Sequence, residues 1–131
     1  MNFSILFPEG ADFVSIIAHD KLDGNTQREL AQNAIELANS RGIRKFLVDV
    51  QGVKNTAATF EQYQLGYKDM EKFFLDRRSK IAICADANDN SHDFIETVFK
   101  NAGYQCHLFN NEADAINWLC VDSNADQCNS R

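Results

Sequence analysis

Three residues at alternate positions form the pattern that comes nearest to a metal site in this sequence. Asp86, Asn88 and Asn90 are spaced like the first oxygen ligands of an EF-hand calcium loop. Such a loop also needs Gly at its sixth position and Glu at its twelfth, where this chain has Ser91 and Thr97. The bidentate ligand is therefore missing. We interpret the segment as a polar loop between a strand and a helix, and we predict no metal site.

Asp49 is a second acidic candidate, because it lies in an apolar strand run like the phosphoacceptor of a receiver domain. Receivers also need an acidic pair after the first strand and a Lys after the last. This chain has Phe7-Pro8 and Asn110-Asn111 at those places. We therefore interpret Asp49 as a strand-end carboxylate that accepts amide N–H groups from the turn that follows it.

The histidines and glycines match no catalytic or phosphate-binding motif. His19, His92 and His107 form neither HxxH nor HExxH, and no GxGxxG or GxxxxGKS/T run occurs. We expect His92 to face solvent in the first turn of a helix and His107 to lie inside a short strand. An enzyme would need Asp49, Asp86 and His92 to converge in a cleft, so we predict no cofactor and a chain that is not an enzyme.

The four cysteines indicate a reducing compartment and a structural role. Cys84 and Cys106 lie in apolar runs, where a free thiol behaves as a small hydrophobic side chain. Cys120 and Cys128 lie in a polar segment, and no two cysteines form a CxxC pair or a zinc-site spacing. Because the N-terminus also lacks the basic region of a secretory signal, we expect a cytoplasmic protein.

Size and charge limit the class of protein. The chain has 131 residues, 44% of them apolar, which suits one domain with its own core. Nineteen acidic residues against thirteen basic ones give a net charge of −6, which argues against nucleic acid as the main partner. The longest apolar run has about seven residues, whereas a membrane span needs about 20. We predict a single domain over residues 1–119, a polar and disordered tail over residues 120–131, and no membrane span.

Apolar patterning predicts the elements that must position these residues. After an opening hairpin, strands alternate with amphipathic helices in the order β-β-α-β-α-β-α-β-α. The predicted strands are 2–7, 13–19, 45–50, 80–86 and 105–109, and the predicted helices are 26–40, 59–74, 91–102 and 112–119. Strands that are apolar on both faces are typical of buried parallel sheets, so we expect an α/β fold with a mixed, mostly parallel sheet.

Polar residues mark where two of these helices begin. Asn25 or Thr26 is placed to cap the first helix, and Thr59 with Gln62 has the spacing of a capping box for the second. Capping alone explains the presence of Thr59, whereas Thr56 has no such structural duty.

The second helix carries an aromatic stripe. We expect this stripe to pack on the sheet, with Leu65 on the opposite side as an exposed contact. Alternatively, its two phenols line a pocket at the carboxyl ends of the strands, where open α/β sheets bind ligands. The stripe consists of Phe60, Tyr63, Tyr67, Met70 and Phe74.

Four segments together carry a resemblance to a known family. They are LVDVQGV (47–53), TAATFEQYQLG (56–66), KIAICAD (80–86) and FIETVFKNAGYQCHLFNNEADAINWL (94–119). In order and spacing they resemble the SpoIIAA-like or STAS domains, the class of anti-sigma-factor antagonists. The likeness is to small stand-alone bacterial members without enzymatic machinery. It implies a SpoIIAA-like fold and a regulatory role.

The resemblance also implies where function would lie. Antagonists of this class carry a phosphorylatable Ser or Thr after the central strand, in a motif close to Asp-Ser-Ser/Thr-Gly. This chain departs from the motif, with Thr56 as the nearest counterpart and Thr59 as the second. The expected partner is a protein, either a kinase or another regulator, docked through loop 51–58 and helix 59–74.

The same superfamily contains lipid-handling relatives, so the resemblance also implies a second reading. In that reading the chain binds a small apolar, lipid-like ligand with the aromatic face of helix 59–74. A closed cavity between this helix and the sheet would favour the ligand reading over the docking reading. The residues expected at the partner or ligand surface are Asn55, Thr56, Phe60, Tyr63 and Tyr67.

Overall fold

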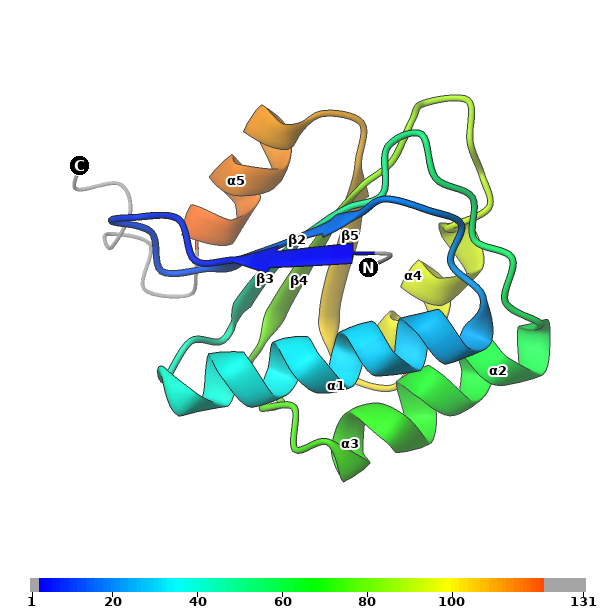
Figure 1. Cartoon of the computed structure of the whole chain (residues 1–131), viewed down its shortest axis with the longest axis horizontal. Helices are drawn as coiled ribbons and strands as arrows, with labels where there is room; N and C mark the ends of the chain where they lie inside the picture. The colour runs from blue at the N-terminus through cyan, green and yellow to red at the C-terminus, as the bar shows by residue number, and fades with distance from the viewer. Residues whose placement is uncertain (1–2, 122–131) are drawn as a thin grey trace.

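Five strands form one sheet with the strand order β1-β2-β3-β4-β5 in the structure, a computed structural model that describes residues 3–121 (Figure 1). The strands are β1 (Phe3–Leu6), β2 (Val14–Ala18), β3 (Lys45–Asp49), β4 (Lys80–Cys84) and β5 (Gln105–Phe109). β1 runs antiparallel to β2, and each later strand runs parallel to the one before it. The predicted mixed, mostly parallel sheet and its element order are confirmed.

The helices lie where the apolar patterning predicts them, with shifts of one or two residues at their ends. They are α1 (Gly24–Ser40), α2 (Thr59–Gln64), the π-helical segment η1 (Leu65–Asp69), α3 (Met70–Lys72), α4 (Asp93–Asn101) and α5 (Glu112–Cys120). α2, η1 and α3 follow one another without a break, and we call them together helix 59–72. Of the predicted tail, Cys120 belongs to α5, and residues 122–131 lie outside the described part of the chain.

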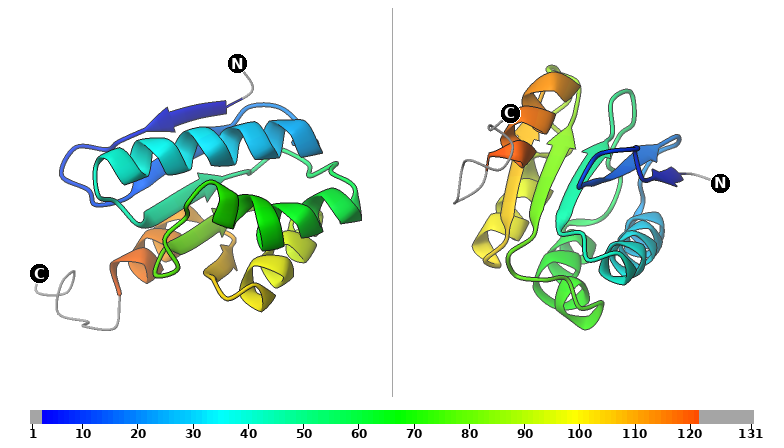
Figure 2. Two further views of the ribbon diagram at one scale, coloured as in Figure 1. Left: turned by 90° about the horizontal axis from the view of Figure 1, so that it is seen from below. Right: turned by 90° about the vertical axis from the view of Figure 1, so that its left-hand side faces the viewer.

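The sheet is covered on both faces, but unequally (Figure 2). α1, helix 59–72 and α4 cover one face over the larger apolar cluster, which includes Ile16, Phe46 and Ile83. Among the helices of residues 3–121, α5 alone covers the other face, where Leu47 and Ala82 belong to a second, smaller cluster. Because successive side chains of a strand point to opposite faces, the runs that are apolar on both sides supply both clusters. A candidate site at the larger cluster is therefore framed by three helices.

α1 begins earlier than its predicted caps. Asp23 is the residue before the first turn, and its Oδ1 accepts the Thr26 N–H at 2.8 Å. Asn25 and Thr26, which the sequence suggests as caps, lie inside the helix instead. A carboxylate in this position satisfies a free N–H and also meets the positive end of the helix, which explains why it outcompetes both neighbours.

Helix 59–72 begins at Thr59 as predicted, but its cap is displaced. Ala58 precedes the first turn, and its N–H donates to Glu61 Oε1 at 2.9 Å. The predicted capping pair of Thr59 and Gln62 is therefore wrong by one residue, and Thr59 does not cap the helix. The Gln62 side chain is buried and serves a different purpose, described below.

The aromatic side chains of helix 59–72 face solvent, which contradicts both predictions made for them. Phe60 is 67% exposed and Tyr63 51%, and the Tyr63 and Tyr67 rings lie 4.5 Å apart on the surface. Phe74, just after the helix, is 80% exposed. These rings neither pack on the sheet nor line a pocket. Leu65, predicted as an exposed contact, is instead buried at 6% exposure.

Polar and small residues decide which face of helix 59–72 turns inward. The inner face carries Gln62, Leu65, Gly66, Asp69 and Met70, at the spacing of a helical stripe. Gln62 bonds a loop, Gly66 allows close contact with α4, and Asp69 pairs with a guanidinium group of α1. Only this face of the helix can make those contacts, and they outweigh the free energy that burying the larger aromatic face would contribute.

Candidate functional site

Two loops pair with each other at the carboxyl ends of the strands. Leu22, after β2, and Asn55, after β3, form an isolated parallel bridge. The Leu22 N–H donates to Lys54 O, and the Thr56 N–H donates to Leu22 O, each at 2.9 Å. This pairing extends the backbone hydrogen bonding of the sheet beyond its strands, so it fixes the position of both loops relative to the core.

Asn55 is the centre of the polar contacts in this region. Its Oδ1 accepts hydrogen bonds from Gln27 Nε2 at 2.7 Å and from the Ala57 N–H at 3.0 Å. Its Nδ2 donates to Gln62 Oε1 at 3.2 Å, and Gln62 Nε2 donates back to Ala57 O at 3.1 Å. A single side chain thus joins α1, loop 51–58 and helix 59–72.

The loop after β4 completes the arrangement. Ser91 Oγ accepts the Asn55 N–H at 3.0 Å, and His92 Nε2–H donates to Val53 O at 2.8 Å. Asp89 Oδ1 accepts the Ser91 N–H at 2.9 Å and the Lys54 ammonium at 3.3 Å. The hydrogen bonds that Ser91 donates lower the pKa of buried Asp89 to about 2.

His92 is 2% exposed, so the prediction that it faces solvent is wrong. The Val53 carbonyl oxygen that accepts its hydrogen bond belongs to a residue 39 positions earlier in the sequence. The residues next to His92 in the sequence do not predict this hydrogen bond, because it forms only when β3 and β4 lie side by side in the sheet. Gln27 and Gln62 were missed as site residues for the same reason.

Replacing Asp89 with asparagine is expected to lower the free energy of unfolding by roughly 1 to 2 kcal/mol at pH 7. The pKa of this carboxyl group is lowered in the folded protein, so its contribution is full above about pH 5 and is lost as the pH falls towards 2. The free energies of unfolding of the parent and of Asp89→Asn, measured in urea, should therefore differ at pH 7 and differ less at pH 2.5. Asp93→Asn, an exposed control in the same region, should stay within about 0.5 kcal/mol of the parent at both pH values. If Asp89→Asn loses the same free energy of unfolding at both pH values, the carboxylate of Asp89 does not stabilise the fold through its lowered pKa.

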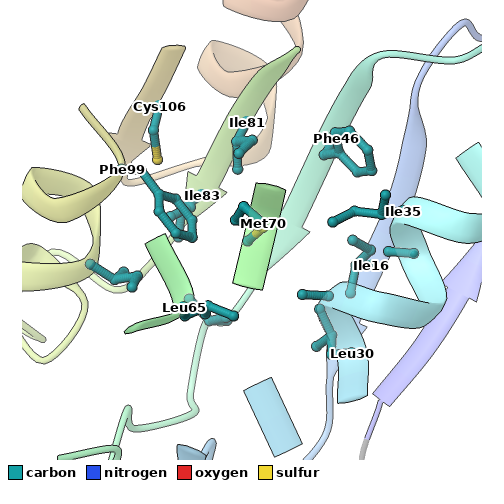
Figure 3. Packing of buried hydrophobic residues seen from close by; sticks show 14 of the residues in the cluster. Ile16, Leu30, Ile35, Phe46, Leu65, Met70, Ile81, Ile83, Phe99 and Cys106 are labelled. Carbon is teal, nitrogen blue, oxygen red and sulfur yellow. The ribbon is translucent and has the colours of Figure 1, made fainter. Parts of the chain in front are cut away.

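An apolar cavity lies beneath this polar region, between the sheet and the three helices of the larger layer. Its volume is about 90 Å³. Figure 3 shows Leu65 and Met70 of helix 59–72 directed towards the strands, with Leu30 and Ile35 of α1 on the neighbouring side. Among the described residues, nineteen line the cavity, and just three of them are polar: Gln27, Asn55 and His92. We call this space the apolar cavity.

The structure separates the residues expected at the partner or ligand surface. Asn55 is partly buried at the rim of the apolar cavity, whereas Thr56 and Thr59 have exposed side chains. Phe60, Tyr63 and Tyr67 lie on the outer side of helix 59–72 and do not line the apolar cavity. The residues of the predicted surface therefore fall into two separate regions. One is an outer aromatic surface next to Thr56, and the other is the inner cavity with Asn55 at its rim.

Asp49 and Asp86 accept main-chain N–H groups, and Cys84 and Cys106 are buried thiols. The Gln51 N–H donates to Asp49 Oδ1 at 3.0 Å, as predicted for a strand-end carboxylate, and the Gly52 N–H donates to Asp86 Oδ2 at 2.7 Å. Burial raises the pKa of the Cys84 thiol to about 12 and also raises that of Cys106. Over residues 3–121 no group of three or more His, Cys, Asp or Glu side chains is placed to hold a metal ion.

Comparison with known proteins bears on the fold. No protein-family model matches the chain, and no curated protein matches it. Among solved structures, an uncharacterized protein of the DUF3478 family from Shewanella loihica PV-4, with a SpoIIAA-like fold, matches at a TM-score of 0.58 and 20% identity. This match covers 91% of the present chain and 94% of the other. The fold is SpoIIAA-like.

A second solved structure places the same architecture inside an enzyme. The photosystem II D1 C-terminal processing protease matches at a TM-score of 0.53 and 9% identity, over 81% of this chain and 34% of the protease. At these identities the likeness is one of fold alone. The SpoIIAA-like fold confirms the resemblance found in the sequence, and in this fold Thr56 lies on an exposed loop after the central strand. None of the helices within residues 3–121 has the length and apolar character needed to span a bilayer.

Proposed function

We propose that the chain is a non-enzymatic binding domain that takes a small apolar ligand into the apolar cavity. The observation that supports this is the cavity itself, which lies between the sheet and helix 59–72, α1 and α4 and is lined almost wholly by apolar side chains. An apolar cavity between helix 59–72 and the sheet favours ligand binding over partner docking for this chain.

The size of the apolar cavity limits the ligand. A void costs about 24 cal/mol per Å³, so 90 Å³ corresponds to roughly 2 kcal/mol of lost stability. Dry cavities of about 150 Å³ bind benzene, so the present volume suits a ligand segment of about four heavy atoms. A stability loss of this size in an otherwise close-packed core supports a binding role for the space.

Filling the cavity from α1 tests the proposal. Ala34 is buried and lines the space, so Ala34→Leu places three more carbons inside it. We expect this variant to raise the free energy of unfolding by about 1 kcal/mol and to abolish ligand binding. The measurements are urea unfolding and the ¹³C methyl spectrum during titration with n-butane, which should shift the isoleucine methyl groups that line the cavity in the parent protein alone.

Ala38 supplies the matched control, because it is buried one turn further along α1 and does not line the apolar cavity. Ala38→Leu should overpack the core and lower the free energy of unfolding by about 1 to 3 kcal/mol. The absence of methyl shifts with n-butane in the parent protein would refute the proposed function, and so would unchanged shifts in Ala34→Leu.

A second candidate function is docking of a regulatory protein on the outer aromatic surface. Phe60, Tyr63 and Tyr67 are exposed together there, and aromatic side chains of this kind are enriched at protein interfaces. Thr56 is exposed on the adjoining loop, where a phosphate would add about 1.5 to 2 negative charges. Native mass spectrometry of the protein isolated from its host tests this candidate. It would be supported by a defined complex that Tyr63→Ser abolishes without a change in melting temperature.

A further inference from the structure

Basic residues gather in two segments at the edge of the sheet where β3 and β4 begin. Segments 41–45 and 72–80 hold seven of the thirteen Lys and Arg residues and one of the nineteen acidic residues. The Lys80 N–H donates to Arg44 O at 2.9 Å, and Asn39 Nδ2 donates to Phe74 O at 3.2 Å. The end of α1 and the connection from α3 to β4 therefore lie side by side (Figure 1). Since most acidic residues lie elsewhere in the chain, the sign of the charge reverses at this edge.

Two of the seven basic side chains serve the fold, and the other five are exposed. Lys45 pairs with Asp12 at 2.9 Å. Lys80 is buried, and its ammonium group donates to Trp118 O at 2.8 Å. These contacts account for the two charges without any partner outside the chain. The five exposed side chains are Arg41, Arg44, Lys72, Arg77 and Arg78.

Carboxylates offset only part of this exposed charge. Asp76 lies 3.0 Å from Arg78 and 3.9 Å from Arg44, so one carboxylate serves two guanidinium groups. Glu71 lies 4.0 Å from Arg77. The exposed cations thus outnumber these carboxylates by five to two. Because charges more than about 8 Å apart are screened at physiological salt, this local excess acts on an approaching partner despite the net charge of −6.

Phe74 belongs to the second segment and occupies a position that normally holds glycine. Helix 59–72 ends in a Schellman motif, in which the Leu75 N–H donates to Met70 O and the Phe74 N–H donates to Glu71 O. Phe74 has a φ of 67°, which glycine adopts freely and other residues rarely adopt. Its ring is 80% exposed, so packing inside the described part of the chain does not offset this strain. The ring is therefore available for a contact outside the chain.

We propose that this edge of the sheet docks peripherally on a membrane surface that carries anionic lipids. The cationic side chains attract the lipid phosphates, and the ring of Phe74 enters the boundary between head groups and acyl chains. This inference goes beyond the proposed function, because the apolar cavity has Asn55 at its rim, at the opposite edge of the sheet. We call the residues that would meet the membrane the basic surface: Arg41, Arg44, Lys72, Phe74, Arg77 and Arg78.

The combination of spread charge and one protruding ring favours a membrane over an acidic protein. Specific protein interfaces bury about 800 Å² per partner around a packed core that is poor in charged residues. At the basic surface the exposed aromatic part is one ring, of about 200 Å² at most, among five cations. An anionic bilayer attracts each of these cations separately and takes up an aromatic ring without a matching pocket.

Sedimentation of the full chain with lipid vesicles tests the inference. One vesicle preparation contains phosphatidylcholine alone, and the other contains phosphatidylcholine and phosphatidylglycerol in equal amounts. We expect binding to the anionic vesicles to be at least tenfold tighter at about 0.1 M salt, and to weaken at least tenfold at about 1 M salt. Equal binding to both preparations would overturn the inference.

Phe74→Gly separates the role of the ring from the stability of the fold. Glycine suits the φ of 67° at this position, so the melting temperature should not fall. Binding to the anionic vesicles should nevertheless weaken at least fivefold, because the inserted ring is lost. A variant that binds these vesicles as tightly as the parent protein would overturn the inference.

Lys72→Gln combined with Arg78→Gln tests the role of charge. Each Lys or Arg near an anionic surface contributes about fivefold to binding, so this double variant should bind at least tenfold more weakly. Lys21→Gln combined with Lys54→Gln is the matched control, since it removes two exposed charges from the paired loops at the opposite edge of the sheet. The control should stay within about twofold of the parent protein. Equal losses in the two double variants would show that net charge drives binding, and would overturn the inference.

An acidic protein is the competing occupant of the basic surface, and poly-L-glutamate serves as its probe. We expect the anionic vesicles to bind and Phe74→Gly to weaken that binding alone. If poly-L-glutamate binds and the anionic vesicles do not, the basic surface serves an acidic polypeptide and the membrane inference is overturned. Binding of neither probe overturns it as well, and none of these outcomes alters the test of the apolar cavity with n-butane.

Discussion

Replacing Gly66 with alanine is expected to lower the free energy of unfolding by about 2 kcal/mol, although alanine is the better helix former. Gly66 lies in η1 on the inner face of helix 59–72, against α4. A Cβ atom there would overlap Val98 Cγ1 and lie 3.1 Å from Phe99 Cδ1. Both neighbours are buried and packed, so they have little room to move, and the two helices must separate.

Gly24→Ala is the matched control for Gly66→Ala. A Cβ atom at Gly24 would also overlap another group, but that group is the carboxylate end of the Glu61 side chain. Because this end can rotate away, we expect a loss below about 1 kcal/mol. Urea unfolding of the two variants measures the difference, and an equal loss in both would refute the claim that Gly66 sets the distance between helix 59–72 and α4.

The arrangement of the sheet was predictable because it depends on strong local signals. Runs such as 45–50 and 80–86 are apolar on both faces, which is typical of strands covered on both sides, and they alternate with amphipathic helices. The strand Gln105–Phe109 has the bounds that the sequence predicts. Hydrophobic periodicity reports burial of whole elements, and in this chain it does so reliably for every strand.

The orientation of helix 59–72 was not predictable from the same signal. A hydropathy pattern assigns the aromatic residues to the core and discards Gln62, Gly66 and Asp69 as surface positions. In the structure those three residues make the contacts that hold the helix, through a loop, α4 and Arg28 of α1. Hydrogen bonds and close approaches depend on partners far away in the sequence, and a single sequence contains no record of them.

The candidate site is hidden from sequence reasoning for a related reason. Its three polar lining residues are Gln27, Asn55 and His92, which lie on three separate segments and form no motif. They meet because β2, β3 and β4 are parallel neighbours, so their carboxyl ends share one edge of the sheet. Topology therefore predicts where a site lies, whereas the identity of its residues needs the loop conformations as well.

Asn55→Ala is expected to lower the free energy of unfolding by about 3 kcal/mol, the largest effect of any substitution discussed for this protein. Truncation leaves the Ala57 N–H, one hydrogen of Gln27 Nε2 and Gln62 Oε1 without partners in a partly buried region. Each such group costs about 1 kcal/mol or more when its partner is removed. Asn88→Ala, an exposed asparagine in the neighbouring loop, should change the same quantity by less than about 0.5 kcal/mol.

The loss at Asn55 should be cooperative, because one side chain serves α1, loop 51–58 and helix 59–72 together. A double-mutant cycle of Asn55→Ala with Gln62→Ala measures this, and we expect a coupling free energy of at least about 1 kcal/mol. Amide hydrogen exchange at Thr56 and Ala57 should accelerate in Asn55→Ala, since their backbone pairing depends on the same contacts. Additive losses with unchanged exchange would mean that the three segments hold their positions independently. The hydrogen bonds around Asn55 would then be a consequence of the fold and would not hold the three segments together.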